Sequence, residues 1–143
     1  MLATAAAPAR AAAGIRYGPS HSPVAAQGQS RGKAALRFAL AQLGKPYAYG
    51  GSGPRAYDCA GLTQQAWRAA GLRIPRTAQQ QAHVGAPVPL DRIKVGDIVI
   101  FYSDASHVGI YAGHGTVVVA RRPGTVIRLE PIRWMPVYGV RRP

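Results

Sequence analysis

The sequence predicts an α+β domain in which N-terminal helices pack on a central antiparallel β-sheet. Residues 30–81 place apolar side chains at helical spacing, and residues 96–140 change to short apolar segments separated by turn residues. The helical and strand patterns therefore occupy separate parts of the chain. This arrangement is typical of α+β folds, whereas alternating helices and strands would favour a parallel sheet.

The chain of 143 residues has the size of one domain with a core of its own. Residues 1–29 are rich in Ala, Pro, Gly and Ser and have no helical or strand periodicity. We therefore expect a flexible N-terminal arm there and the folded domain in residues 30–143. Residues 1–7 are similar to the end of a signal peptide but lack its basic start and long apolar region. One hypothesis is that the arm lies across a neighbouring cleft and blocks it.

The chain is strongly basic, with 18 Lys and Arg against 5 Asp and Glu and a formal net charge of +13. Such a surplus predicts attraction to an anionic partner, such as nucleic acid, a membrane surface or an acidic cell-wall polymer. Nucleic acid is the least favoured of these, because the arginines are spread along the chain and no zinc-ligand set or RNA-binding motif is present. The apolar runs are too short for a transmembrane segment.

The single cysteine excludes an internal disulfide and a multi-cysteine metal site. The acidic residues form no paired or metal-ligand motif; they are Asp58, Asp91, Asp97, Asp104 and Glu130. We therefore expect no metal and no cofactor, and a two-carboxylate glycosidase is not favoured.

Cys59 is expected to open a helix. A segment rich in Gly, Pro and Ser, residues 50–54, precedes it, and apolar residues then recur at helical spacing until Gly71 stops the helix. Asp58 is the candidate N-cap. A thiol in the first turn is close to unpaired backbone N–H groups and to the positive end of the helix dipole, which favour the thiolate. The alternative is that a lone cysteine is a small buried apolar residue.

Two other helices are predicted on either side of this one. The first is expected to begin with Ser30 as its N-cap and to end at Gly44. It leads into an aromatic, glycine-bearing loop over residues 45–51, whose tyrosines either cover the core or line a cleft. The other is short, with Thr77 as its N-cap, and is stopped by Gly85.

Short apolar segments predict strands over residues 96–102, 107–111, 116–120, 125–129 and 137–140. Residues 87–90 are expected to be a connector. A turn at residues 113–115 joins the second and third strands into a hairpin.

His107 is the first residue of the second predicted strand, so its imidazole can lie at the rim of the sheet. A cysteine at a helix start and a histidine at a strand start, packed together, would form a thiolate–imidazolium pair. The 48 positions from Cys59 to His107 are no obstacle, because such partners need only be neighbours in space. The alternative is a histidine with a structural role.

Four segments occur in the order and approximate spacing found in the NlpC/p60 cell-wall peptidases: Tyr57–Leu62, Pro75–Thr77, Val95–Val99 and His107–Tyr111. The similarity covers nearly the whole expected domain and is strongest to secreted, mycobacterial-type members. The resemblance implies a papain-like fold and cleavage of peptidoglycan stem peptides, often between D-glutamate and meso-diaminopimelate. It also implies a secreted, cell-wall location with peptidoglycan as the partner, and we expect a monomer.

On this resemblance, Cys59 is the nucleophile and His107 is the base that activates it. The backbone N–H of Cys59 and the hydroxyl of Tyr47 would stabilise the oxyanion. Asp58 would face a free amine of the substrate, a role that competes with capping the helix. Ser106, directly before the histidine, belongs to the expected substrate side.

Three positions depart from the family pattern. The third catalytic residue, usually His, Glu, Asn or Gln, aligns with Val119, which cannot accept a hydrogen bond from the imidazole. Ala60 and Ala78 stand where serine is usual or common, and both changes remove polar groups from the expected substrate cleft. His114 lies in the hairpin turn, which should be too far from His107 for it to act as a substitute.

Two functions therefore stay open. The first is a cysteine endopeptidase of peptidoglycan that works with a Cys59–His107 dyad. The second is a degenerate family member that binds peptidoglycan through its charge and cleft without cutting it, as the losses at Val119, Ala60 and Ala78 indicate. A lipid-modifying acyl transferase on a related scaffold is disfavoured by the cell-wall motifs.

Overall fold

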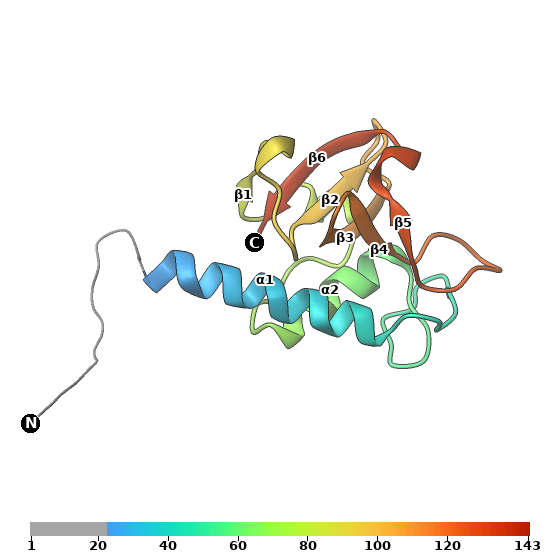
Figure 1. The fold of residues 1–143 in the computed structure, drawn as a ribbon. Coiled ribbons are helices and arrows are strands. Elements are labelled where there is room, and N and C mark those ends of the chain that lie inside the picture. The colour runs from blue at the N-terminus through green and yellow to red at the C-terminus, as the bar shows by residue number, and fades with distance from the viewer. Residues whose placement is uncertain (1–22) are drawn as a thin grey trace, which may run out of the picture. The chain divides into compact units, whose positions relative to one another are not determined.

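The computed structural model describes the backbone of residues 23–143 and the side chains of residues 30–143. Residues 1–22 lie outside this part, and with them most of the expected arm, the start that is similar to a signal peptide and the hypothesis that the arm blocks a cleft. Residues 31–143 form one compact unit, whose fold is drawn in Figure 1. None of the helices in the described part combines the length and the apolar character that a membrane span requires.

The elements of the described part follow the predicted order, with helices first and strands afterwards (Figure 1). The helices are α1 (Pro23–Ala41), α2 (Cys59–Ala69) and α3 (Ala78–Gln81), with short 3-10 turns at η2 (Leu90–Arg92) and η3 (Ile132–Trp134). The strands are β1 (Ala86–Pro87), β2 (Ile98–Phe101), β3 (His107–Gly113), β4 (Thr116–Val119), β5 (Arg128–Pro131) and β6 (Val137–Arg142).

The strands form a mixed-length antiparallel sheet in the order β1-β6-β2-β3-β4-β5. Strand β2 is the continuous apolar segment Ile98–Phe101, and every one of its residues is buried. Such a strand is covered on both faces. On one face, Ile98 and Ile100 belong to the main core with the helices, and on the other, Val99 and Phe101 pack in a second apolar cluster.

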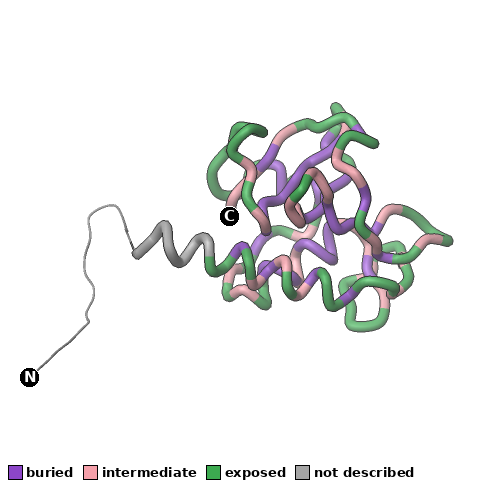
Figure 2. Tube along the Cα trace, in the orientation of Figure 1, coloured by how far each residue is buried: buried purple, intermediate pink, exposed green. Residues whose placement is uncertain are grey.

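The main core lies between the helices and the sheet, where Figure 2 shows the buried parts of the chain. Helix α2 contributes its apolar face, with Leu62, Ala66 and Trp67 almost completely buried. The indole N–H of Trp67 donates to the carbonyl of Gly96 at 3.1 Å, which satisfies the one polar atom of this large side chain. Helix α2 is thereby fixed against the sheet, and so is its first residue.

Helix α1 packs closely against the turn before β2. A Cβ added at Gly32 would lie 2.7 Å from the carbonyl oxygen of Val95, and a Cβ added at Gly96 would meet the backbone of Gly32. Gly96 also has a φ of 90°, which disfavours other residues. Glycine at both positions therefore allows the helix and the turn to approach each other.

Two of the expected boundaries are wrong. Helix α1 begins at Pro23, so Ser30 is inside the helix and is not its N-cap. Proline is favoured in the first turn, and the alanines after it are strong helix formers. Strand β5 is Arg128–Pro131 instead of residues 125–129, because the backbone N–H of Ile127 bonds the carbonyl of Lys45 at 2.8 Å, outside the sheet. Strand β1 was also not expected from the sequence.

Candidate active site

Helix α2 begins at Cys59, as the sequence predicts, because Asp58 caps it. Asp58 has extended backbone angles, and its Oδ1 accepts from the N–H of Gly61 at 2.7 Å. The backbone N–H of Asp58 bonds the carbonyl of Gly51 at 2.9 Å, which ties the preceding glycine loop to the helix. The thiol is therefore carried by the first turn of a well-anchored helix.

Asp58 is also paired with Arg76. The guanidinium forms a bidentate contact, with Nη1 at 3.0 Å from Oδ1 and Nη2 at 2.8 Å from Oδ2. Oδ2 accepts in addition from the N–H of Gly50 at 3.1 Å. The carboxylate is thus occupied by a cap, an ion pair and a loop contact. A substrate amine at Asp58 would have to share it with Arg76.

The thiol of Cys59 reaches the edge of β3 where the sheet opens. The β3–β4 pairing ends at Ile110 and Val118. The backbone N–H of Tyr111 bonds the carbonyl of Asp97, so it points towards β2. Backbone groups of successive residues in a strand point to opposite sides, so the N–H of Val108, three residues earlier, points towards β4. The β4 strand does not pair with β3 at this position. The backbone of Val108 instead lies close enough to the thiol to lower its pKa.

His107 precedes Val108 and begins β3 opposite Phe101. Its ring packs against Phe101, with the centroids 5.7 Å apart, and near Tyr102 at 6.5 Å. The side chain is buried, and its Nε2 atom has no hydrogen-bond partner among the described residues. Cys59 therefore lies near Val108, the residue that follows His107, while the imidazole packs against Phe101.

Burial acts on the two groups in opposite directions. It raises the pKa of the Cys59 thiol, although the nearby backbone of Val108 and Ala60 partly opposes this effect. It lowers the pKa of His107 to about 4, and the charge of Arg121 lowers it further while Glu130 raises it. Burial thus favours the neutral form of each group, and the expected thiolate–imidazolium pair stays a prediction.

Val119 occupies the strand next to His107. Its Cγ1 lies 2.8 Å from the position that a Cβ on Gly109 would take, so it faces Gly109 across the β3–β4 pair. It is fully buried in the second apolar cluster with Val99 and Met135. A valine offers no acceptor or donor to the imidazole, which agrees with the unpaired Nε2 atom.

Tyr47 lies close to the thiol. The pKa of its hydroxyl is raised first by burial and then by the charges of Cys59 and Asp58. Its ring packs against the main core, and its backbone N–H bonds the carbonyl of Thr125 at 3.0 Å. The loop after α1 therefore carries a hydroxyl to the side of the cysteine.

The other expected site residues differ in exposure. Ala60 and Ala78 are only 4% and 5% exposed, so they belong to the core and offer little surface to a cleft. Ser106 is exposed beside His107. His114 is exposed in the β3–β4 turn, seven residues and thus about 23 Å along the chain from His107.

Sequence reasoning did not identify a polar group on the other side of His107. Arg121 donates to Oε1 of Glu130 at 3.1 Å and interacts with the side chain of Tyr102. Arg128 donates to Oε2 of the same carboxylate at 2.7 Å. The signal that could have revealed this polar group is the position of Arg121. It lies two residues after Val119 and therefore on the same face of the chain.

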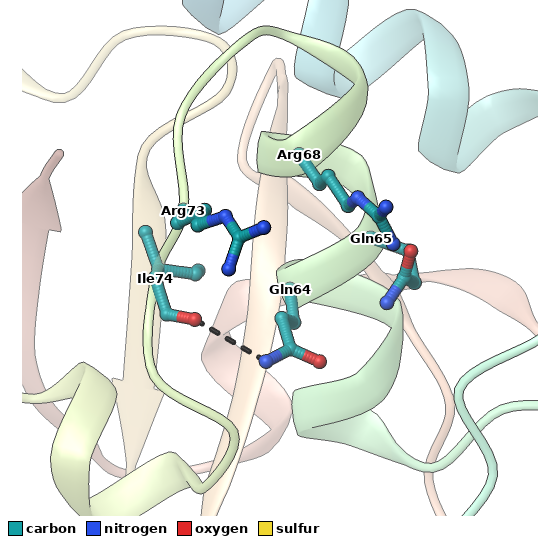
Figure 3. Close-up of a pocket in the computed structure, with 5 residues that line it drawn as sticks. All are labelled: Gln64, Gln65, Arg68, Arg73 and Ile74. Atoms are coloured by element: carbon teal, nitrogen blue, oxygen red, sulfur yellow. Dashed lines mark hydrogen bonds between the residues drawn. The ribbon is translucent and has the colours of Figure 1, made fainter.

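A separate pocket of about 240 Å³ lies against the later turns of α2 (Figure 3). Gln64, Gln65 and Arg68 on the helix line it together with Arg73 and Ile74 on the loop that follows, and the Gln64 amide donates to the carbonyl of Ile74 at 3.3 Å. None of these residues was expected in the site.

Comparisons with known proteins identify the family of this chain. The model of the NlpC/P60 family matches residues 44–137. A probable endopeptidase of Corynebacterium glutamicum strain R is 43% identical over 141 residues, covering 99% of this chain and 66% of that protein. The chain belongs to the NlpC/P60 family.

Other relatives match over smaller shares of their own length. A probable endopeptidase of Mycobacterium tuberculosis is 44% identical over 110 residues, covering 76% of this chain and 29% of that protein. The murein DD-endopeptidase MepH of Escherichia coli is 37% identical over 126 residues, covering 80% of this chain and 46% of that protein. The chain thus spans less than two thirds of the length of these relatives.

The fold is that of solved family members, which confirms the predicted papain-like α+β class. NlpC1 of Trichomonas vaginalis is similar with a TM-score of 0.75 and 33% identity, covering 79% of this chain and 44% of that one. The NlpC/p60 domain of the peptidoglycan hydrolase SagA has a TM-score of 0.70 and 27% identity, covering 76% and 96%. RipA mutated at a glutamate has a TM-score of 0.73 and 28% identity, covering 82% and 64%.

Proposed function

We propose that this chain hydrolyses an amide bond in the stem peptides of peptidoglycan, with Cys59 as nucleophile and His107 as general base. The observation that carries the proposal is the closeness of the Cys59 thiol to the backbone of Val108, the residue that follows His107, which lowers the pKa of the thiol. This contact holds the first residue of α2 against the first residues of β3. The family and the printed names of the relatives give the substrate class.

The reaction begins from the neutral pair. Nε2 of His107 is enclosed without a partner, so Nδ1 is the nitrogen available to the thiol. As the Cys59 sulfur attacks the amide carbonyl, its proton passes to the imidazole. The imidazolium then gives the proton to the leaving amine, and an acyl-enzyme remains. Water, deprotonated by the same imidazole, releases the acid product and regenerates the thiol.

The oxyanion of the tetrahedral intermediate needs donors close to the sulfur. The backbone N–H of Cys59 belongs to the first turn of α2, whose N–H groups have no partner within the helix. The hydroxyl of Tyr47 is the second donor, since it lies near both Cys59 and Asp58. These two groups come from different segments and would act on the same oxygen.

The relatives support this assignment without fixing the bond. The solved RipA variants are mutated at a cysteine, a histidine and a glutamate, and that histidine and glutamate are twelve positions apart, as His107 and Val119 are here. We propose the D-glutamyl–diaminopimelate bond and a location in the cell wall outside the cell. MepH is named for a different bond, so the product mass decides.

The test is incubation of the 143-residue chain with purified peptidoglycan and with a defined muropeptide, followed by mass spectrometry. We expect a stem-peptide fragment whose release depends on Cys59 and is lost in Cys59→Ala. Fragment release that is equal in both proteins would contradict the role of the cysteine.

A second function, binding of peptidoglycan without cleavage, is favoured by one specific observation. The Nε2 atom of His107 is buried without a partner, and Val119 cannot supply one. An imidazole that nothing orients is a weak base in such a dyad. Sedimentation with the polymer, equal in wild type and Cys59→Ala and without any released fragment, would establish this function instead.

A further inference from the structure

A second pocket adjoins His107 on the side of the strand where β4 ends. It has a volume of about 290 Å³ and is lined by Tyr102, Ser106, His107, Arg121 and Arg122. The loop that leads into His107 forms one wall, and the chain directly after β4 forms the other. The pocket is therefore contiguous with the proposed base of the reaction.

The charge around this pocket is positive. Arg121 and Arg128 both bind Glu130, whose side chain is only 1% exposed, so two guanidinium groups face one buried carboxylate. Arg122 adds a third cation on the exposed wall. Asp104 is the other acid near the pocket, where it accepts from the N–H of Ser106 at 3.2 Å. Three cations against two anions leave the group with a net positive charge.

The position of the pocket relates it to one half of the substrate. His107 gives its proton to the leaving amine, so the amine half of the substrate lies on the imidazole side of the cleft. The acyl half stays on the side of Cys59, Tyr47 and Asp58. Whatever enters the pocket next to His107 is thus carried by the amine half.

We propose that this pocket binds a free carboxylate on the residue that supplies the leaving amine. The inference rests on the proposed function and deepens it, because it assigns a substrate preference to Arg121 and Arg122. Guanidinium groups bind carboxylates through paired, charge-assisted hydrogen bonds. Tyr102 and Ser106 add hydroxyl groups that can donate to the same anion.

The test uses two short peptides that differ only in this group, one with a carboxylate and one with a carboxamide on the amine-side residue. Cleavage gives kcat/KM for the wild-type chain, and binding to Cys59→Ala gives Kd without turnover. We expect both measurements to favour the carboxylate peptide by about tenfold or more, since hydrogen bonds to charged groups are worth about 1.5–3 kcal/mol.

Arginine variants then locate the preference. Arg122→Gln should lower it several-fold, mainly through KM or Kd, and Arg121→Lys should retain more of it than Arg121→Gln. Arg68→Gln is the matched control, because it removes the same charge from the exposed face of α2 and should leave the preference unchanged. Arg121→Gln leaves Glu130 with only Arg128, so its folding is checked by circular dichroism.

The outcomes separate the two proposals. Equal cleavage of both peptides would overturn the carboxylate pocket and leave the peptidase function standing. Absence of cleavage with preferential binding of the carboxylate peptide would overturn the peptidase function and leave the pocket standing. A chain that neither cleaves nor binds either peptide would overturn both.

Discussion

Val119 faces Gly109 across the β3–β4 pair, and Gly109 is two residues along β3 from His107, so the side chains of His107 and Val119 lie on the same face of the sheet. The valine therefore occupies the direction in which the imidazole would find a partner. Instead, Nε2 of His107 is buried and unpaired. An unpaired buried polar atom is costly, and without a partner at Nε2 the orientation of the imidazole is less fixed.

The first prediction concerns Val119→Asn, a change of similar volume that adds an amide within this cluster. We expect kcat on a muropeptide to rise by about 10-fold to 1000-fold, because the amide can bond Nε2 and fix the imidazole. The same change should lower the free energy of unfolding by about 1–3 kcal/mol, since it buries a polar group. Steady-state kinetics and urea denaturation measure the two effects.

Val117→Asn is the control for this prediction. Val117 is buried in the same apolar cluster but pairs with Tyr111, farther along β3 from His107. It should cost similar stability without raising kcat. Activity that is unchanged or lower in Val119→Asn would show that the missing third partner does not limit the reaction. Activity found only in Val119→Asn would identify the natural chain as the binding form.

The second prediction concerns pH. The pKa of His107 is about 4 in the folded chain, below the ordinary histidine value of about 6.5. Between these values the unfolded chain binds the proton and the folded chain does not, so protonation favours unfolding. The contribution of the neutral imidazole to the free energy of unfolding is fully present above pH 6.5. It is lost as the pH falls towards 4, and the total loss is up to about 3 kcal/mol.

Chemical denaturation from pH 7 to pH 4 measures this contribution as a slope. His107→Gln should lose it, so that its free energy of unfolding depends less steeply on pH than that of the wild type. His83→Gln, at an exposed histidine, should keep the wild-type slope. Parallel curves for the wild type and His107→Gln would mean that the imidazole takes up its proton in the folded chain.

Some features of the fold and the site are encoded locally in the sequence, and others depend on contacts between distant segments. Local signals were sufficient for the start of α2, because an N-cap and a helical repeat are encoded next to each other at Asp58 and Cys59. The start of β3 at His107 was also expected. In contrast, Ser30 has the composition of an N-cap but lies inside α1, because the residues before it continue the helix.

Features that depend on contacts between distant segments could not be predicted in this way. The pairing of Asp58 with Arg76, the opening of the sheet beside Val108 and the group around Glu130 all arise from tertiary packing. The burial of Cys59 and His107 is the most important of these. Position at a helix start predicts a thiolate, but desolvation by the surrounding core outweighs that effect and raises the pKa of Cys59.

The third prediction follows from this burial. We expect alkylation of Cys59 by iodoacetamide to depend on pH with a midpoint above the ordinary thiol pKa of about 8.5. His107→Gln should move the midpoint little, because a neutral imidazole adds no charge. Cys59 is the single cysteine, so Cys59→Ala gives the background rate. A midpoint well below pH 8 that disappears in His107→Gln would instead show a resting ion pair.

The last prediction concerns the pair formed by Asp58 and Arg76. Asp58 and Arg76 side chains are 16% and 36% exposed, so their contact is partly screened by solvent. Asp58→Asn keeps an oxygen that can cap α2 but loses the charge, whereas Asp58→Ala loses both. We therefore expect Asp58→Ala to lower the free energy of unfolding by about 1 kcal/mol more than Asp58→Asn, the usual contribution of an N-cap.

A double-mutant cycle of Asp58→Asn with Arg76→Gln isolates the ion pair. The coupling energy should be about 1 kcal/mol, at the upper end for pairs that solvent reaches, because the contact is bidentate. Asp91→Asn, at an exposed acid, is the control and should show no coupling with Arg76→Gln.

If Asp58 also binds a substrate amine, Arg76→Gln should lower KM while destabilising the fold, because it frees the carboxylate for that amine. A raised KM would show that Arg76 itself holds the substrate or orients Asp58 for it.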